Sequence, residues 1–195
     1  MRKELILEVA QKHFSEKGYH ASLTDIAKDA GIRKATLYNY FQSKDELFLE
    51  IILEETESYF ESKKTEFASL VEFSSEERLH KMFLSIVKYF SNKNKLMFWR
   101  WMTLIDAEDL KRQIKENIGV REKRFMAVIY EVFEKGIRDK EIKELPILAL
   151  MNAYYALIHG ALDGVLLFDN EDMSKLFVGN VWDIFWQGIQ NKSGV

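Results

Sequence analysis

The stretch Ser22–Tyr40 constrains the fold more than any other part of the chain, because it predicts two short helices joined by a tight turn. Ser22 can cap the first helix, and Asp25, three residues later, can reach back to complete a capping box. Gly31 suits the left-handed backbone that ends a helix at little cost. The second helix is expected to begin at about Lys34.

The inner and outer faces of these two helices differ in character. Ile26, Ala27 and Ala30 form a small apolar stripe on the first helix, and Leu37 and Phe41 face inward from the second. Small inward residues let two helices cross closely, as in a helix-turn-helix that places its second helix in the major groove of DNA. The outer face of the second helix carries Arg33, Lys34, Thr36, Tyr38, Asn39 and Tyr40. An ordinary helical hairpin is the alternative.

Three runs of residues match one known pattern. They are Ala10-x-x-x-Phe14-x-x-x-Gly18-Tyr19, Thr24-x-Ile26-Ala27-x-x-Ala30-Gly31-Ile32, and Thr36-Leu37-Tyr38-x-Tyr40-Phe41-x-x-Lys44-x-x-Leu47. The pattern covers about residues 5–50 and closely resembles the N-terminal domain of the TetR family of bacterial transcriptional regulators. Arg33 departs from it, because the family often has a capping Ser or Thr there; Arg33 adds a positive charge beside the DNA instead.

The resemblance implies an all-α fold, with a three-helix helix-turn-helix head that binds DNA and a larger helical body that binds a ligand and dimerises. The implied phosphate contacts are Thr24, Tyr38, Tyr40 and Lys44, and the residues placed to meet base edges are Lys34, Ala35, Thr36 and Asn39. Phosphate contacts set the register of a protein on DNA, and base contacts set its sequence preference. Packing within the head is the alternative role for the two tyrosines.

Charge and composition fit a division into a DNA-binding domain at 1–46 and a ligand-binding and dimerisation domain at 47–195. The net charge is −3, but residues 1–45 hold eight Lys or Arg against six Asp or Glu, which gives +2 and leaves −5 for the remainder. A mildly basic head on an acidic body suits DNA contact through one end. The chain has no cysteine and no recognisable signal peptide, so we expect a cytoplasmic protein.

Apolar periodicity predicts helices along the rest of the chain. The expected helices are 2–17, 44–71, 76–91, 96–105, 106–138, 146–168 and 173–190. The apolar stripe changes phase at Gly119, where we expect a bend or break. The segment 146–168 is long enough to span a membrane, but Asn152, His159 and Asp163 lie within it and no second span exists, so no membrane partner is predicted.

The last two helices are the predicted dimer interface. In the TetR family these helices pair into a four-helix bundle, and two heads related by a two-fold axis would read an inverted repeat. The residues expected at this interface are Ala153, Ala156, Gly160, Gly164, Phe177, Val181 and Phe185. A large monomeric core is the alternative reading of these apolar helices.

The resemblance also implies a small-molecule pocket in the body, and the segment 97–102 is the most aromatic part of the chain. Trp99 and Trp101 must point to different faces, because residues two apart on a helix are about 200° apart. The expected effector is apolar or amphipathic. The candidate pocket residues are Trp99, Arg100, Trp101, Met102, Tyr154, Tyr155 and His159.

These observations predict a transcriptional regulator, a repressor, that binds its operator as a homodimer and is released by a small-molecule effector. No phosphate-binding glycine loop is present, and the pair His159 and Asp163 is read as a local hydrogen bond, so no cofactor, metal or catalytic residue is predicted. The alternatives are a helical ligand-binding protein or enzyme with a vestigial head, and an architectural DNA-binding protein without a ligand.

Overall fold

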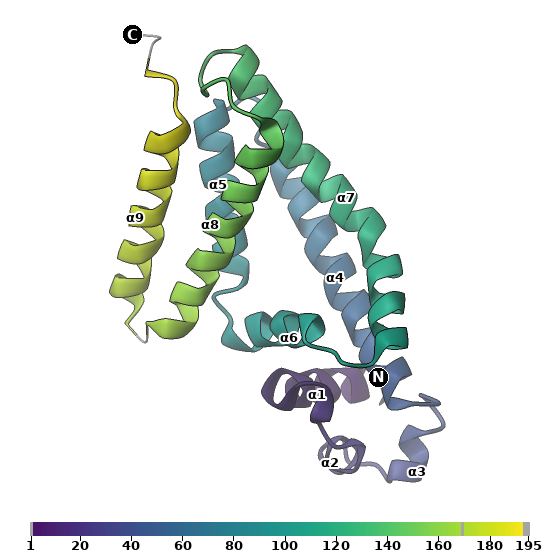
Figure 1. The fold of residues 1–195 in the computed structure, drawn as a ribbon. Helices are drawn as coiled ribbons and strands as arrows, with labels where there is room; N and C mark the ends of the chain where they lie inside the picture. Colours follow the sequence, from purple (N-terminus) through teal and green to yellow (C-terminus); the bar gives the residue numbers. More distant parts are fainter. Residues whose placement is uncertain (1, 169, 193–195) are drawn as a thin grey trace. The chain divides into compact units, whose positions relative to one another are not determined.

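The computed structural model describes residues 2–168 and 170–192, which are helical almost throughout (Figure 1). The helices are α1 (Arg2–Lys17), α2 (Leu23–Asp29), α3 (Lys34–Leu37), α4 (Lys44–Ala68), α5 (Ser75–Tyr89), α6 (Lys93–Thr103), α7 (Glu108–Arg138), α8 (Ile147–Leu167) and α9 (Glu171–Ile189), with a 3-10 turn at Gly18–His20. Within the described residues, strand-like pairing is confined to an antiparallel bridge between Ile142 and Gln190. The all-α fold class predicted from the sequence is confirmed.

Polar caps fix where several of these helices begin. Ser74 Oγ accepts a hydrogen bond from the Glu77 amide at 3.2 Å, and the Glu77 carboxylate accepts one from the Ser74 amide at 3.1 Å, so α5 begins with a complete capping box. Asn170 Oδ1 accepts hydrogen bonds from the amides of Asp172 and Met173 at the start of α9. These bonds satisfy amides that have no partner inside the helix.

Helix α7 corrects one expectation. It runs without interruption through Gly119, so a break there is wrong, while the alternative of a bend stays a prediction. A glycine inside a helix costs only about 1 kcal/mol relative to alanine, and Ile114 and Ile118 before it and Ile129 after it are all buried. Burial of these side chains on both sides of Gly119 outweighs so small a penalty.

The chain forms two compact units, and the first contains Met1–Glu61 with Asn94–Arg121. Its core combines buried residues of α1 to α3 and the first half of α4 with residues of α6 and the first half of α7. The core members from the later segment are Phe98, Ile105, Leu110, Ile114 and Ile118. The predicted boundary at 46/47 concerns function and stays a prediction, whereas the packing joins both sides of it in one unit.

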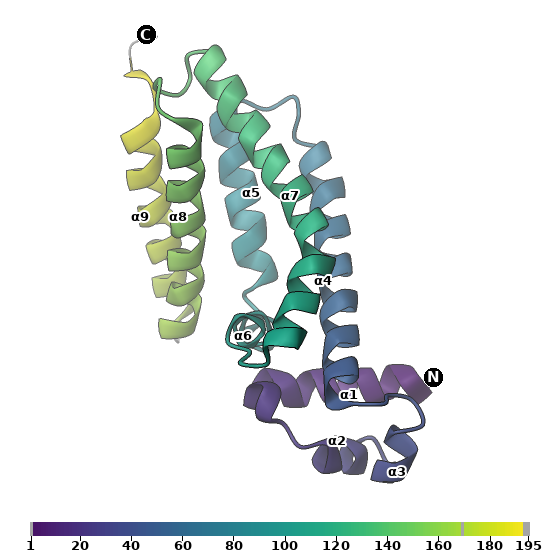
Figure 2. The ribbon, with the colours of Figure 1, turned by 45° about the vertical axis from the view of Figure 1, so that its right-hand side comes forward.

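The second unit contains Ser62–Lys93 and Glu122–Val195, and within it α8 and α9 run side by side (Figures 1 and 2). Tyr154 of α8 is fully buried and donates its hydroxyl proton to the Leu79 carbonyl oxygen of α5 at 2.7 Å. No helix among the described residues is both long enough and apolar enough to cross a membrane.

Aromatic packing joins α9 to α5 in the second unit. The Trp182 indole stacks on the His80 ring with centroids 4.5 Å apart and packs against Phe83 at 5.7 Å. Burial lowers the pKa of His80 below its ordinary value of 6.5, and Asp183 opposes this shift. The α5–α9 contact therefore favours the neutral imidazole.

This contact predicts a pH-dependent stability. Because the unfolded chain binds the His80 proton more tightly than the folded one, stability is present above pH 6.5 and is lost as the pH falls through the lower folded pKa. His80→Phe keeps an aromatic ring on Trp182 and should flatten the fall of the free energy of unfolding below about pH 6.5. Urea unfolding across this pH range measures the effect. The matched control is His20→Gln, at an exposed position. If His80→Phe, like this control, leaves the pH dependence of the free energy of unfolding unchanged, His80 is not the titrating group.

Candidate nucleic-acid interface

Helix α2 is the first helix of the predicted pair, and its start is capped as expected. Ser22 Oγ accepts hydrogen bonds from the amides of Thr24 at 3.2 Å and Asp25 at 3.4 Å. The Asp25 carboxylate was expected to return to the Ser22 amide, but it lies 3.9 Å from Lys17 Nζ instead. The cap is therefore confirmed, and the reciprocal half of the capping box is wrong.

The turn between the two helices has the predicted geometry. Gly31 has a φ of +68°, and its amide donates to the Lys28 carbonyl at 3.0 Å. The Ile32 amide donates to the Ala27 carbonyl at 2.9 Å, which completes a Schellman motif. A side chain at Gly31 would meet no atom within 4 Å, so this position needs glycine for its backbone conformation and not for space.

Helix α3 is anchored by buried side chains on one face and exposes the other face to solvent. Leu37 and Phe41 are 0% exposed and hold the helix against the core, as predicted. Arg33 occupies the N-cap position and makes no side-chain cap, so its guanidinium extends from an exposed residue. The predicted DNA-contacting residues that are exposed are Thr24, Arg33, Lys34, Ala35, Tyr38, Asn39 and Tyr40, while Thr36 and Lys44 are half-buried.

The two tyrosines lie on this outer face. Tyr38 is 45% exposed and Tyr40 is 36% exposed, which leaves both side chains accessible to a partner. Tyrosine hydroxyls are common donors to phosphate oxygens. Their contacts with DNA, like those of the other residues named above, stay predictions.

Tyr19 is a residue that the sequence reasoning did not assign to the site, although it lies in the matched lead-in. Its hydroxyl donates to the Asp45 carboxylate at the start of α4, and burial together with this bond raises the pKa of Tyr19 to about 12. Lys44 Nζ lies 4.7 Å from the centre of the Tyr19 ring, a cation–π geometry. Burial lowers the pKa of Lys44, and Asp45 opposes the shift. This cluster holds the start of α4 against the α1–α2 corner.

A second polar contact ties α1 to the end of α2. His13 Nε2 and Asp29 Oδ2 are 2.8 Å apart, and His13 is only 8% exposed. The two residues are 16 positions apart, so no local spacing in the sequence indicates the pair. Together with the Tyr19 cluster, this bond limits how α2 and α3 can shift relative to α1.

Helix α6 packs directly on the corner that precedes α2. Gly18 has a φ of +59°, and an added Cβ would lie 2.6 Å from the Trp101 indole. Phe98, which is 1% exposed, packs against Phe48 of α4 with centroids 5.8 Å apart. Gly18 is therefore needed both for its left-handed backbone and for the space that Trp101 occupies.

The predicted pocket residues of α6 face different neighbours within the first unit. Trp99 packs against Tyr59 at 5.0 Å and Phe60 at 6.4 Å, on the α4 side, whereas Trp101 covers Gly18. This confirms that the two indoles point to different faces of α6. The remaining two, Arg100 and Met102, are half-buried.

The predicted pocket residues of α8 lie in the second unit and divide between core and surface. Tyr154 is in the core, 5.9 Å from both Phe133 and Phe185 by ring centroids. Tyr155 is 55% exposed, and its ring lies 4.2 Å from that of His159 on the exposed side of α8. The pocket itself stays a prediction.

The predicted interface residues of α8 and α9 fall into two groups. Gly164 and Phe177 contact each other within the chain, since a Cβ on Gly164 would lie 2.5 Å from the Phe177 ring. Phe185 is half-buried against Trp182. Ala153 and Ala156 are exposed, Gly160 has no atom within 4 Å of an added Cβ, and Val181 is half-buried.

Larger exposed side chains accompany that second group, and the sequence reasoning did not assign them to the dimer interface. They are Leu148 (70% exposed), Tyr155 (55%), Leu176 (57%) and Ile184 (72%). Periodicity could have identified them, because they continue the outer faces of α8 and α9. An exposed apolar face of this kind is typical of an interaction surface.

A shallow groove between α1 and α4 is strongly acidic. It is lined by Glu4, Leu7, Glu8, Gln11, Ile51, Glu54 and Glu55. Burial raises the pKa of Glu54, and the neighbouring Glu50 adds to the shift. Within the described residues, no group of three His, Cys, Asp or Glu side chains has an arrangement that could hold a metal ion.

The exposed α3, held on a buried corner by α1 and α2, defines a helix-turn-helix protein of the class that binds DNA. Comparison with known proteins agrees. The sequence profile of the bacterial regulatory proteins, tetR family, matches residues 6–51. The HTH-type transcriptional regulator YhgD of Bacillus subtilis is 32% identical over 165 residues, which are 80% of this chain and 82% of YhgD.

Two solved structures have the same fold. The transcriptional regulator FadR from Bacillus subtilis, in complex with stearoyl-CoA, has a TM-score of 0.72 and 23% identity and covers 95% of this chain and 98% of its own. AibR, in complex with isovaleryl coenzyme A and operator DNA, has a TM-score of 0.74 and 18% identity and covers 94% and 97%. The chain belongs to the TetR family and is a transcriptional regulator.

The glycines of the head give a matched prediction. Gly31→Ala should cost about 1–2 kcal/mol, the penalty of a left-handed backbone for an L-residue. Gly18→Ala carries the same penalty and also pushes a methyl group into Trp101, which adds about 1–3 kcal/mol. Urea unfolding of both variants measures the difference. Equal losses would mean that Trp101 moves aside freely.

Lys44 gives a prediction about DNA affinity. If its ammonium contacts a phosphate, Lys44→Ala should weaken binding to all duplexes alike and reduce the slope of log affinity against log salt by about one. Fluorescence anisotropy with a labelled duplex at several salt concentrations measures this slope. The control is Lys123→Ala, at an exposed position of α7, which should leave the slope unchanged. An unaltered slope for Lys44→Ala would remove this residue from the phosphate contacts.

Proposed function

We propose that this TetR-family regulator is a homodimeric repressor that binds an inverted-repeat operator through its two heads and leaves it when a small effector binds. The observation that carries the proposal is the exposed surface of α3 and its flanking residues, from Arg33 to Tyr40, above the fully buried anchors Leu37 and Phe41. A surface of this kind, with cations, an amide and hydroxyls on a rigid base, suits both phosphate and base contacts.

In the proposed complex the residues of α3 and of its neighbouring segments have two different roles. Lys34, Ala35, Thr36 and Asn39 meet base edges in the major groove and set the sequence preference. The phosphate contacts come from Thr24, Tyr38, Tyr40 and Lys44, and Arg33 adds charge beside the backbone. As a regulator of transcription, the protein acts in the cytoplasm, where the bacterial chromosome lies, and has no catalytic role.

The exposed apolar faces of α8 and α9 support dimerisation. Leu148, Leu176 and Ile184 are each more than half exposed in the single chain, and Gly160 leaves open space beside α8. A second copy of the same two helices would cover these side chains in a four-helix bundle. A two-fold axis through that bundle gives the symmetry that an inverted repeat requires.

The effector is proposed to be a small apolar or amphipathic molecule bound in the helical body. The ligands in the FadR and AibR structures, stearoyl-CoA and isovaleryl coenzyme A, support an amphipathic effector. Such a ligand releases DNA only if it binds the DNA-incompetent arrangement more tightly, because equal affinity for both arrangements shifts no equilibrium.

Selection of random duplexes on the purified protein at moderate salt tests the proposal. Enrichment of an inverted repeat, with half-sites about one helical turn or a little more apart, is the expected result. A folded, dimeric protein that enriches no sequence would contradict the repressor. That outcome would favour the alternative of a helical small-molecule-binding protein or enzyme with a vestigial head.

The dimer interface is tested at Ile184, because this side chain is 72% exposed and its replacement leaves the core intact. Ile184→Glu should yield folded monomers, since a dimer would bury the new charge without a partner. Sedimentation velocity measures the association state, and circular dichroism confirms the fold. Phe185→Glu is a poorer choice because Phe185 packs against Tyr154 and Trp182 within the chain.

The matched control for this substitution is Val120→Glu, at a position of α7 that is 57% exposed. This variant should sediment as the wild type does. A dimeric Ile184→Glu variant would show that the face carrying Ile184 is not the contact between subunits.

A further inference from the structure

Two cationic side chains are buried in the second unit, and they differ sharply in their partners. Lys63 of α4 is 5% exposed and Arg78 of α5 is 8% exposed. Buried cations in proteins are normally paired, because an unpaired charge away from water is unfavourable. The partners of these two buried cations can therefore be compared within the same unit.

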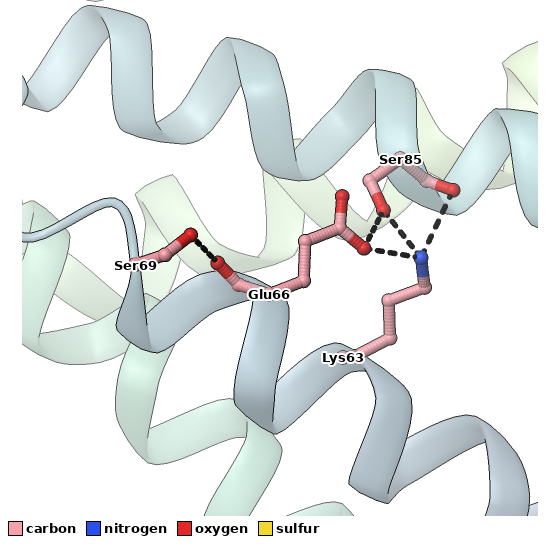
Figure 3. Close-up of polar contacts among 4 residues, drawn as sticks. All are labelled: Lys63, Glu66, Ser69 and Ser85. Carbon is pink, nitrogen blue, oxygen red and sulfur yellow. Dashed lines mark hydrogen bonds and ion pairs between the residues drawn. The ribbon is translucent and has the colours of Figure 1, made fainter.

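Lys63 is fully partnered, as Figure 3 shows. Its ammonium donates to Glu66 Oε2 at 2.8 Å, to the Ser85 hydroxyl, and to the Ser85 carbonyl oxygen at 3.4 Å. The Ser85 hydroxyl in turn donates to Glu66 Oε2 at 2.7 Å. These bonds to Lys63 and Ser85 outweigh burial and lower the pKa of Glu66. The Lys63 charge is thus neutralised by Glu66 and its donors are hydrogen-bonded. The cluster joins the end of α4 to α5.

Arg78 has no such arrangement. Its Nε–H is shielded from solvent and has no hydrogen-bond acceptor, and its guanidinium forms no ion pair with the residues that the structure describes. Ser75, one turn earlier on α5, is 0% exposed, and its Oγ also has no partner among those residues. Two neighbouring buried groups on one helix thus lack the partner that such groups normally have.

The position of Arg78 on α5 follows from the contacts around it. Seven residues are close to two helical turns, so Arg78 lies on the same face of α5 as Ser85, which faces the end of α4 (Figure 3). Ser75 lies beside α7, since its Cβ is 3.0 Å from an added Cβ on Gly136. Arg78 therefore belongs to the side of α5 that is covered by α4 and α7 within the second unit.

The two carboxylates that bond Lys63, Ser85 or Ser75 are already engaged. Glu66 of α4 bonds Lys63 and Ser85, and the Glu141 carboxylate accepts a hydrogen bond from the Ser75 amide at 2.7 Å. Neither forms an ion pair with Arg78. The guanidinium therefore keeps an unneutralised charge and a planar set of donors, the geometry that binds a carboxylate or a phosphate through two parallel hydrogen bonds.

We propose that Arg78 binds the anionic group of a small molecule, a carboxylate or a phosphate, with the Ser75 hydroxyl as a second donor. The inference rests on the proposed function, since it makes the effector an amphipathic molecule with an anionic end. The second unit contains apolar side chains of the type that bind the rest of such a molecule, among them Phe67 and Phe125, which pack against each other.

The first test needs no ligand and compares the two buried cations. Arg78→Met removes an unpaired buried charge and keeps an unbranched apolar chain, so it should raise the melting temperature of the ligand-free protein by about 3 °C or more. Lys63→Met, the matched control, removes the buried cation that bonds both Glu66 and Ser85, so it should lower the melting temperature. A fall for Arg78→Met comparable to that for Lys63→Met would overturn the proposal, because it would mean that Arg78 is a structural residue.

The second test identifies the anion. Straight-chain carboxylates from acetate to stearate, the matched alcohols and inorganic phosphate are titrated against the wild type and Arg78→Met by calorimetry. The wild type should bind at least one carboxylate about tenfold more tightly than its alcohol, or bind phosphate, and Arg78→Met should lose that preference. A preference for phosphate alone would assign the head group as a phosphate and support the same site.

Two outcomes overturn the proposal. One is a wild type that shows no preference for any anion over its neutral match, and the other is a preference that survives in Arg78→Met. Operator selection is performed without ligand, so it reports on the proposed repressor separately. A protein that enriches an inverted repeat yet binds no anion would refute the anion site and leave the DNA-binding function standing.

Discussion

The head of this regulator depends on an apolar core that continues beyond the head itself. Phe48 of α4 packs between Phe14 of α1 and Phe98 of α6, with centroids 4.6 and 5.8 Å away. Burial of one such ring contributes about 1.5–3 kcal/mol, whereas a helical head of about 46 residues alone is near the size at which a core becomes marginal. Helix α6 and the first half of α7 supply the missing side of that core.

This core allows the recognition surface to remain polar and exposed. Helix α3 is short, and two fully buried side chains, Leu37 and Phe41, hold it in place. Its exposed residues, Lys34 and Ala35, are thus available for the proposed DNA contacts. The Trp101 indole on Gly18 makes the placement of α6 part of the same arrangement, because a shift of α6 must disturb the corner from which α2 departs. Any effector that moves α6 would act on the head through this contact.

Local sequence patterns predicted most of the fold, and long-range contacts escaped them. Capping residues and apolar spacing identified the α2–α3 corner and its turn at Gly31, because those signals act within a few residues. The same reasoning overestimated the tendency of Gly119 to break helix α7. Side-chain burial on both sides of this residue outweighs the small free-energy penalty of a glycine in a helix. The contact between Gly18 and Trp101 joins distant segments, and the missing partner of Arg78 is a property of three packed helices. Neither has a signature in local spacing.

Native-state hydrogen exchange tests most directly whether head and α6 form one cooperative unit. Amides in the centres of α1 (Arg2–Lys17) and α6 (Lys93–Thr103) should open with the same free energy and the same dependence on denaturant, because they share one core. Exchange of α1 at a clearly lower free energy than α6 would contradict the account. It would show that the head unfolds by itself and that the aromatic contacts to α6 contribute little to holding α3 in place.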